Sequence, residues 1–176
     1  VAAALAGLLA LLALSTQCLG DDQVSIVEGA DGIPVATHQG RSFKLSFEAY
    51  MERFAADDLQ RPMTGGIVFT GSSSMVRWLT LEQDMAPMPV RNRGFGGSNS
   101  AHLWWYAERS VLPTQPRLIV AYIGDNDMPQ QAVDIDNYMK YVGLFVEKVF
   151  AQSPQTRVAF ISNKPSPSRW HLWEKY

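Results

Sequence analysis

The sequence predicts an α/β fold in which helices cover both faces of a parallel β-sheet, giving a three-layer α/β/α sandwich. Short apolar runs alternate along the chain with longer segments whose apolar residues recur at helical spacing. Prolines and clusters of turn-forming residues separate the two kinds of segment. Strands that are joined through helices pair in parallel, and such sheets are buried on both faces.

Each element is expected at a definite place. The first helix is expected over residues 43–58, where apolar side chains form one stripe: Phe43, Phe47, Tyr50, Met51 and Phe54. Strands are expected over 67–70, 89–92, 118–123 and 158–162, with helices over 73–84, 98–110 and 133–152 between them. Pro116 and Pro154 precede the last two strands, as expected where helices end before them.

The amino end has the composition of a secretory signal peptide. Residues 1–20 are an Ala- and Leu-rich run that ends in small residues, and Asp21 and Asp22 follow directly. The run is short for a transmembrane span, and its apolar residues do not form a single helical stripe. We therefore expect a secreted or periplasmic protein, with a linker or amino-terminal extension over 21–42 and one domain over 43–176.

Composition limits the class of partner. Fifteen Lys and Arg against 17 Asp and Glu give a net charge of −2, which argues against nucleic acid as the main partner. The only cysteine, Cys18, lies within the expected signal peptide, so a mature domain would contain no disulfide. A lipid anchor at Cys18 is not favoured by the residues before it, so no stable membrane association is expected after cleavage. No Cys or His cluster in the sequence indicates a metal site.

Three polar loops each follow an expected strand. They are the Gly-Ser-Ser-Ser segment at 71–74, the Gly-rich segment at 92–98 and the segment at 122–127. Because the carboxyl ends of parallel strands share one edge of the sheet, the three loops should line one crevice. A serine at the start of a helix there is exposed, and the free helix amides favour negative charge. Taken alone, the first loop also fits an ordinary helix N-cap.

These loops resemble the motifs of the SGNH hydrolases, the GDSL esterase/lipase superfamily, over about residues 67–170. Ser73 is the third residue of the first motif, where the family has its nucleophile, and Ser72 replaces the usual Asp. Gly97 matches the second motif and Asn126 the amide of the third. The resemblance implies a flavodoxin-like parallel sheet, here without its last strand and helix. It also implies a serine ester hydrolase without a cofactor or a metal.

The resemblance implies that Ser73 attacks an ester carbonyl and that the Ser73 and Gly97 N–H groups and the Asn126 amide form an oxyanion hole. Loss of one such donor typically costs about a hundredfold to a thousandfold in rate. Three further side chains of the crevice are predicted to contact substrate: Phe95, Asp127 and Arg169. The partner implied is a small-molecule ester with a short acyl or acetyl group, which includes acetylated carbohydrates.

The acid and base of such an enzyme are missing from the sequence. The family carries both in a late Asp-x-x-His motif, and this chain has none. His38 precedes the first strand of the domain, His102 follows the second loop and His171 follows the last strand, so none has the position of the base. We therefore expect that the acid and base lie beyond Tyr176 and that these 176 residues alone are nearly inactive. The full gene product is expected to be an esterase.

Two non-catalytic alternatives stay open. A flavodoxin-like binding domain would hold phosphate with the Ser-rich loop and the following helix amides, although Gly97 and Asn126 would then have no stated role. A degenerate hydrolase would bind acyl or glycan groups without cleaving them. The sequence carries no signal for the oligomeric state.

Overall fold

A computed structural model describes residues 23–128, 134–164, 167, 170, 171 and 174. The chain divides into two compact units, Val1–Lys44 and Leu45–Tyr176, each of which is described by itself. The expected signal peptide, with Cys18, lies outside the described residues.

The amino-terminal unit contains a three-stranded antiparallel sheet in the order β1-β2-β3. Its strands are β1 (Val24–Glu28), β2 (Pro34–His38) and β3 (Arg41–Lys44). Two tight turns join them, and Gly32 and Gly40 take φ values of 76° and 81° there, which favour glycine. The sequence interpretation of residues 21–42 as a linker or extension did not anticipate these strands, because β1 is mostly exposed and β2 buries only two of its five residues, so the alternating pattern is weak.

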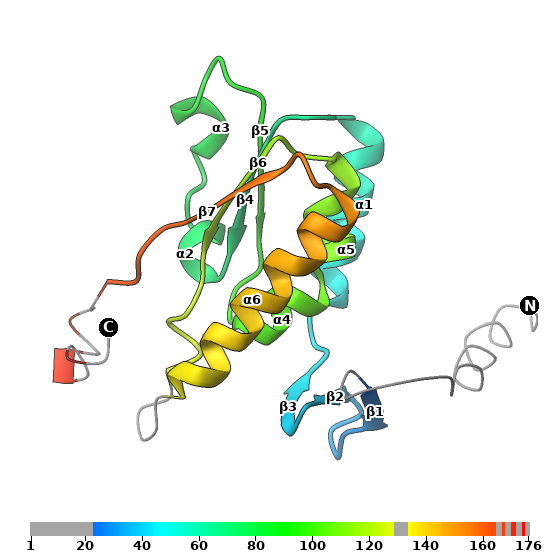
Figure 1. Ribbon diagram of the computed structural model, residues 1–176. Helices are drawn as coiled ribbons and strands as arrows, with labels where there is room; N and C mark the ends of the chain where they lie inside the picture. The colour runs from blue at the N-terminus through cyan, green and yellow to red at the C-terminus, as the bar shows by residue number, and fades with distance from the viewer. Residues whose placement is uncertain (1–22, 129–133, 165–166, 168–169, 172–173, 175–176) are drawn as a thin grey trace, which may run out of the picture. The chain divides into compact units, whose positions relative to one another are not determined.

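The carboxyl-terminal unit is built on a parallel sheet in the order β5-β4-β6-β7 (Figure 1). The strands are β4 (Ile67–Gly71), β5 (Val90–Gly94), β6 (Leu118–Tyr122) and β7 (Arg157–Phe160). Gly71 at the end of β4 lies opposite Gly94 on one side and Tyr122 on the other. The carboxyl ends of three strands therefore meet at one edge, as the predicted fold class requires.

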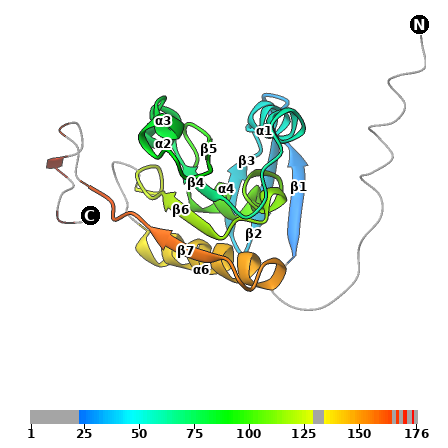
Figure 2. The ribbon, with the colours of Figure 1, turned by 90° about the horizontal axis from the view of Figure 1, so that it is seen from above.

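Helices cover both faces of this sheet, which confirms the predicted three layers (Figure 2). In chain order they are α1 (Glu48–Gln60), α2 (Ser73–Val76), α3 (Leu81–Asp84), α4 (Ser100–Trp105), α5 (Ala107–Ser110), the 3-10 helix η1 (Leu112–Thr114) and α6 (Ile135–Gln152). The short helices α2 and α3 pack on one face, and α4 and α6 pack on the other. Among the described residues, no helix combines the length and the apolar character needed to cross a membrane.

Each face of the sheet has its own apolar core. Ile119 and Ala121 of β6 pack with Phe145 and Val149 of α6 on one face. Phe69 and Tyr122 belong to the cluster on the other face, with Met75 of α2. A third cluster of aromatic side chains lies along α1: Phe47, Phe54, Phe95 and Tyr106, together with Met51.

Three predicted helices differ in extent from those observed. The first begins at Glu48 rather than at residue 43, because Phe43 belongs to β3. The segment 73–84 forms two short helices, and its Asp84 carboxylate accepts hydrogen bonds from Trp78 Nε1 and Thr80 Oγ1. The segment 98–110 is interrupted at Tyr106, whose φ and ψ of −89° and 4° leave the helical region. Apolar periodicity continues through such breaks, so the sequence did not reveal them.

Candidate functional site

The first loop places a serine hydroxyl at the carboxyl edge of the sheet. Ser73 is the first residue of α2 and is partly exposed, two residues after the end of β4. Within the described part of the chain, the Ser73 hydroxyl makes no hydrogen bond. It is therefore available to an external partner, as a nucleophile must be.

Gly71 sets the turn that leads into this helix. Its φ of 136° is accessible almost only to glycine, and a Cβ there would overlap the Tyr122 carbonyl oxygen. The Gly71 carbonyl accepts from Phe95 N at 2.9 Å, and Ser72 N donates to Tyr122 O at 3.3 Å. The first loop is therefore tied through backbone hydrogen bonds to the strand on each side.

The second loop passes close to Ser73. A Cβ built on Gly96 would lie 3.9 Å from the Ser73 Cβ. The next residue, Gly97, is exposed with a φ of 90°, and nothing lies within 4 Å of the position of its Cβ. A ligand therefore has open space beside Gly97, one residue from the point of contact with Ser73.

The third loop joins the second through Asn126. Asn126 Nδ2 donates to Ser98 O at 2.8 Å, so the side-chain amide lies beside the peptide that joins Ser98 to Asn99, one residue beyond Gly97. An amide nitrogen carries two donor hydrogens, and this bond uses one of them. The structure thus links the loops of Ser73, Gly97 and Asn126 through contacts between the first and second and between the second and third.

Asp127, which the sequence predicts to contact substrate, is bonded within the protein to the start of α4. Its carboxylate is buried and accepts from Ser100 N at 2.9 and 3.1 Å and from the Ser100 hydroxyl. These bonds to Ser100 hold Asp127, and with it the neighbouring Asn126, at the amino end of α4. Burial, and then the charge of Asp127, also raises the pKa of Tyr138, whose hydroxyl donates to Ile123 O.

Phe95, also predicted to contact substrate, is a core residue. It is fully buried, and its ring packs edge-on against Phe47 at 5.2 Å and Tyr106 at 6.0 Å. The sequence places Phe95 between two glycines, but it does not show on which side of the loop the Phe95 ring lies. Arg169, the third predicted substrate contact, lies outside the described residues.

Neither histidine of the carboxyl-terminal unit is bonded to Ser73 within the described residues. His102 is buried and closes a capping box at the start of α4, where His102 Nδ1 accepts from Asn99 N at 3.2 Å and His102 N donates to Asn99 Oδ1. Its ring also packs edge-on against Phe47 at 4.8 Å. His171 is exposed. The capping box explains why His102 lies beside the second loop.

Ser72 marks the departure from the usual first motif. Its side chain is buried, and the hydroxyl has no hydrogen-bond partner in the described structure. A buried hydroxyl without a partner lowers the stability of the fold, so Ser72 stabilises the first loop less than a hydrogen-bonded side chain at this position would. The described residues contain no group of His, Cys, Asp and Glu side chains that could hold a metal ion.

Sequence reasoning missed two residues of α1 that face this region. Tyr50 was predicted only as part of an apolar stripe, yet its hydroxyl lies 3.4 Å from the position of a Gly96 Cβ. Arg53, one turn later, places its guanidinium over the Tyr50 ring at 4.8 Å. An Arg three residues after a Tyr on a helix was the available signal, because such positions share a face.

No protein-family model matches the chain. Over 136 residues, the chain is 26% identical to platelet-activating factor acetylhydrolase IB subunit alpha1 of Rattus norvegicus, and the Mus musculus protein gives the same figures. The aligned region covers 75% of this chain and 55% of those proteins. The chain therefore spans about half the length of the curated relatives that it matches.

Solved structures share the fold. A Streptococcus pneumonia protein assigned as a platelet activating factor gives a TM-score of 0.61 at 19% identity, covering 69% of this chain and 56% of that one. A Bacteroides fragilis protein assigned as an acylhydrolase gives 0.58 at 22% identity, covering 70% and 65%. A GDSL-like lipase of Bacteroides thetaiotaomicron gives 0.57 at 19% identity, covering 70% and 64%. The resemblance predicted from the sequence motifs is confirmed at the level of the fold.

Proposed function

We propose that this chain, which has the fold of the GDSL-type hydrolases, is the nucleophile-bearing part of a serine ester hydrolase. The observation that carries the proposal is the unbonded Ser73 hydroxyl at the start of α2, beside the loops of Gly97 and Asn126. The N-cap of α2 is Ser72, whose side chain makes no capping bond, and Ser73 is the first helical residue. Ser73 makes no such bond within the described residues.

The proposed reaction begins with attack of Ser73 Oγ on the ester carbonyl carbon. Negative charge then develops on the carbonyl oxygen, where the Ser73 and Gly97 N–H groups and the second Asn126 amide hydrogen donate to it. Collapse of this intermediate releases the alcohol and leaves an acyl-Ser73 ester, which water hydrolyses. Asn126 suits this role because its amide is neutral and keeps its donors at every pH.

The proton of Ser73 needs a base. We propose that a His from polypeptide outside residues 1–176 is this base and that an Asp from the same polypeptide orients it, because no histidine is bonded to Ser73 within the described residues. A serine hydrolase without its histidine typically loses about a millionfold in turnover. Residues 1–176 alone should then retain only the slow reaction that binding and the oxyanion hole support.

The first substrate class to test is a short-chain ester. The curated relatives are named acetylhydrolases, so acetyl esters are the first members of this class to test. We also propose that the mature protein is secreted or periplasmic. Amino-terminal sequencing of the exported product should begin near Asp21, and retention of residues 1–20 would contradict this location.

A serine-reactive fluorophosphonate tests the proposed nucleophile. The natural polypeptide that contains these residues should gain one phosphonate by intact mass, and Ser73→Ala should abolish the gain. Ser74→Ala is the matched control, because Ser74 is the exposed neighbour in the same helix and should leave labelling unchanged. Labelling of Ser74, or labelling that survives Ser73→Ala, would contradict the assignment.

A second candidate is a binding protein that retains the crevice without catalysis. The absence of a hydrogen-bonded imidazole at Ser73 within the described residues favours it. In that case a folded natural polypeptide would resist the fluorophosphonate. It would still bind an acylated ligand, and substitution of Asn126 would weaken that binding.

A further inference from the structure

A pocket of about 570 Å³ runs along β5, one of the two edge strands of the described sheet. It lies between α1 on one side and residues 76–83 on the other. Arg53 and Phe54 of α1, Val76 and Trp78, and Gly94 of β5 are among its lining residues. Val76 ends the helix that Ser73 begins, and Gly94 precedes the second loop, so one end of the pocket adjoins the candidate site.

Most of the charge in this pocket is already paired. Three arginines share three carboxylates: Arg61, Arg91 and Arg93 with Asp57, Asp58 and Glu82. Burial would raise the pKa of Asp57, but hydrogen bonds from Arg61 and Arg93 outweigh it and lower that pKa. The ionised carboxylates therefore balance these three guanidinium groups.

Arg53 is the cation left over. Its side chain is exposed and has no carboxylate partner among the described residues. The guanidinium is held at 4.8 Å from the centre of the Tyr50 ring and at 5.5 Å from that of Phe54. Stacking orients a planar guanidinium and leaves its N–H groups free to donate.

Tyr50 connects this cation with Ser73. The Tyr50 hydroxyl and the Ser73 Cβ lie 3.4 and 3.9 Å from one point, the position of a Gly96 Cβ. Within the described residues, the Tyr50 hydroxyl makes no hydrogen bond, so its donor is available. A substrate held at Ser73 could therefore reach the Tyr50 hydroxyl, and the Arg53 guanidinium lies over the ring of the same tyrosine.

We propose that Arg53, which lines this pocket, and Tyr50, which lies beside Arg53 but outside the pocket lining, form a subsite for an anionic group of the substrate, a carboxylate or a phosphate. Arg53 supplies the charge and Tyr50 a neutral donor between Arg53 and the reacting ester. The inference rests on the proposed function only in assigning the anion to an ester substrate. The binding of an anion follows from the unbalanced cation and the pocket beside it.

Titration of the full chain with small probes tests the subsite without catalysis. Phenyl phosphate, benzoate and benzyl alcohol share an aromatic ring and differ in charge. The tighter anion should bind at least about tenfold more strongly than the alcohol, since a charge-assisted hydrogen bond contributes about 1.5 kcal/mol or more. The Nε–H resonance of Arg53 should shift, and the stronger of the two anions identifies the group.

Variants show whether Arg53 is responsible. Arg53→Gln should weaken binding of the tighter anion about tenfold, and Tyr50→Phe should weaken it severalfold. Arg157→Gln is the matched control, because Arg157 is an exposed arginine on β7, at the opposite edge of the sheet. Equal binding of all three probes, or equal affinity of Arg53→Gln and Arg157→Gln, would overturn the proposal.

Kinetics with the natural polypeptide then separate the two proposals. Arg53→Gln should lower kcat/KM about tenfold for an anionic ester, such as the mono-4-nitrophenyl ester of succinate, and should spare 4-nitrophenyl acetate. An equal loss on both esters would contradict the subsite. Inactivity of the wild type on both esters would count against the proposed hydrolase, while the titration would still decide the anion subsite.

Discussion

Gly71→Ala should destabilise the carboxyl-terminal unit severely, because the new methyl group has no free space. At the Gly71 φ of 136°, a Cβ would overlap the Tyr122 carbonyl oxygen and lie 2.8 Å from its carbon. Both obstructing atoms belong to the backbone of β6, which pairs with β4 and cannot rotate away as a side chain would. Strand β6 or the turn must therefore move.

The size of the effect follows from three contributions. An alanine at this φ costs about 1–3 kcal/mol. Loss of the 3.3 Å hydrogen bond from Ser72 N to Tyr122 O costs about 1 kcal/mol. Displacement of β6 from β4 adds to both, so we expect a loss of about 4 kcal/mol, which is large for a single substitution.

Equilibrium unfolding in urea, followed by far-UV circular dichroism, measures this loss. Gly143→Ala is the matched control, because Gly143 lies inside α6 and nothing is within 4 Å of its Cβ position. That variant should be more stable than the wild type by up to about 1 kcal/mol. A Gly71→Ala protein within 1 kcal/mol of the wild type would refute the reasoning.

Three further substitutions test groups around the site. Arg93→Met should lower the free energy of unfolding in urea by about 3 kcal/mol, because it leaves the carboxylates of Asp57 and Asp58 without their Arg93 partner. An unchanged free energy of unfolding would contradict this expectation. Asp127→Asn should lower the free energy of unfolding by about 1–2 kcal/mol, because a neutral amide accepts the Ser100 hydrogen bonds more weakly than a carboxylate does. The same variant should slow fluorophosphonate labelling of Ser73. Labelling at the wild-type rate would show that Asp127 does not influence the site. Burial, and then the charge of Glu48, raises the pKa of Tyr106. The contribution of its protonated hydroxyl to the free energy of unfolding is therefore complete below the unfolded pKa of about 10 and is lost as the pH rises above it. The stability difference between wild type and Tyr106→Phe should therefore shift by about 1 kcal/mol against the wild type between pH 9 and 11, and a constant difference would contradict this.

The parallel sheet could be predicted because its strands are strongly apolar. Four buried positions in a row, as in residues 67–70, give an unambiguous signal for a strand covered on both faces. The amino-terminal strands gave no comparable signal, since β1 exposes four of its five residues and β2 buries only two of five. Helix breaks such as the one at Tyr106 depend on tertiary contacts, here its burial and its hydroxyl bonded to Glu48.

The sequence likewise predicted which loops form the candidate site but not how each of their side chains is oriented. Ser73, Gly97 and Asn126 were predicted from motifs at strand ends, and the topology of a parallel sheet brings the loops that carry them together. Phe95 and Asp127 sit in the same loops, but the orientation of a loop side chain depends on what surrounds it. The aromatic cluster along α1 takes the Phe95 ring, and the amino end of α4 takes the Asp127 carboxylate.

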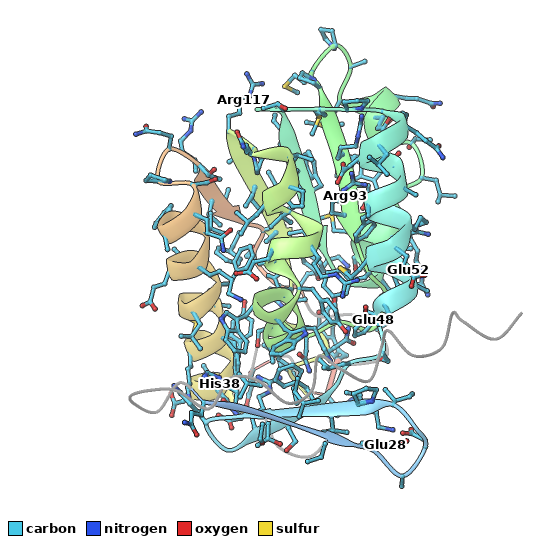
Figure 3. The ribbon with its side chains drawn as sticks, turned by 90° about the vertical axis from the view of Figure 1, so that its right-hand side faces the viewer. Glu28, His38, Glu48, Glu52, Arg93 and Arg117 are labelled. Carbon is cyan, nitrogen blue, oxygen red and sulfur yellow. The ribbon has the colours of Figure 1, made fainter. Side chains whose placement is uncertain are left out.

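A buried ion pair, rather than apolar packing alone, holds α1 in register with the second loop. Arg93 lies beside α1 (Figure 3). Two nitrogens of its guanidinium bind carboxylates of successive residues: Arg93 Nη1 contacts Asp57 at 2.8 Å and Arg93 Nη2 contacts Asp58. Such a forked contact is directional, whereas aromatic rings can slide along one another at little cost. Because Arg93 immediately precedes the glycines of the second loop, the same contact sets how far along β5 the α1 residues Tyr50 and Arg53 lie. The position of the proposed anion subsite relative to Ser73 therefore depends on this ion pair.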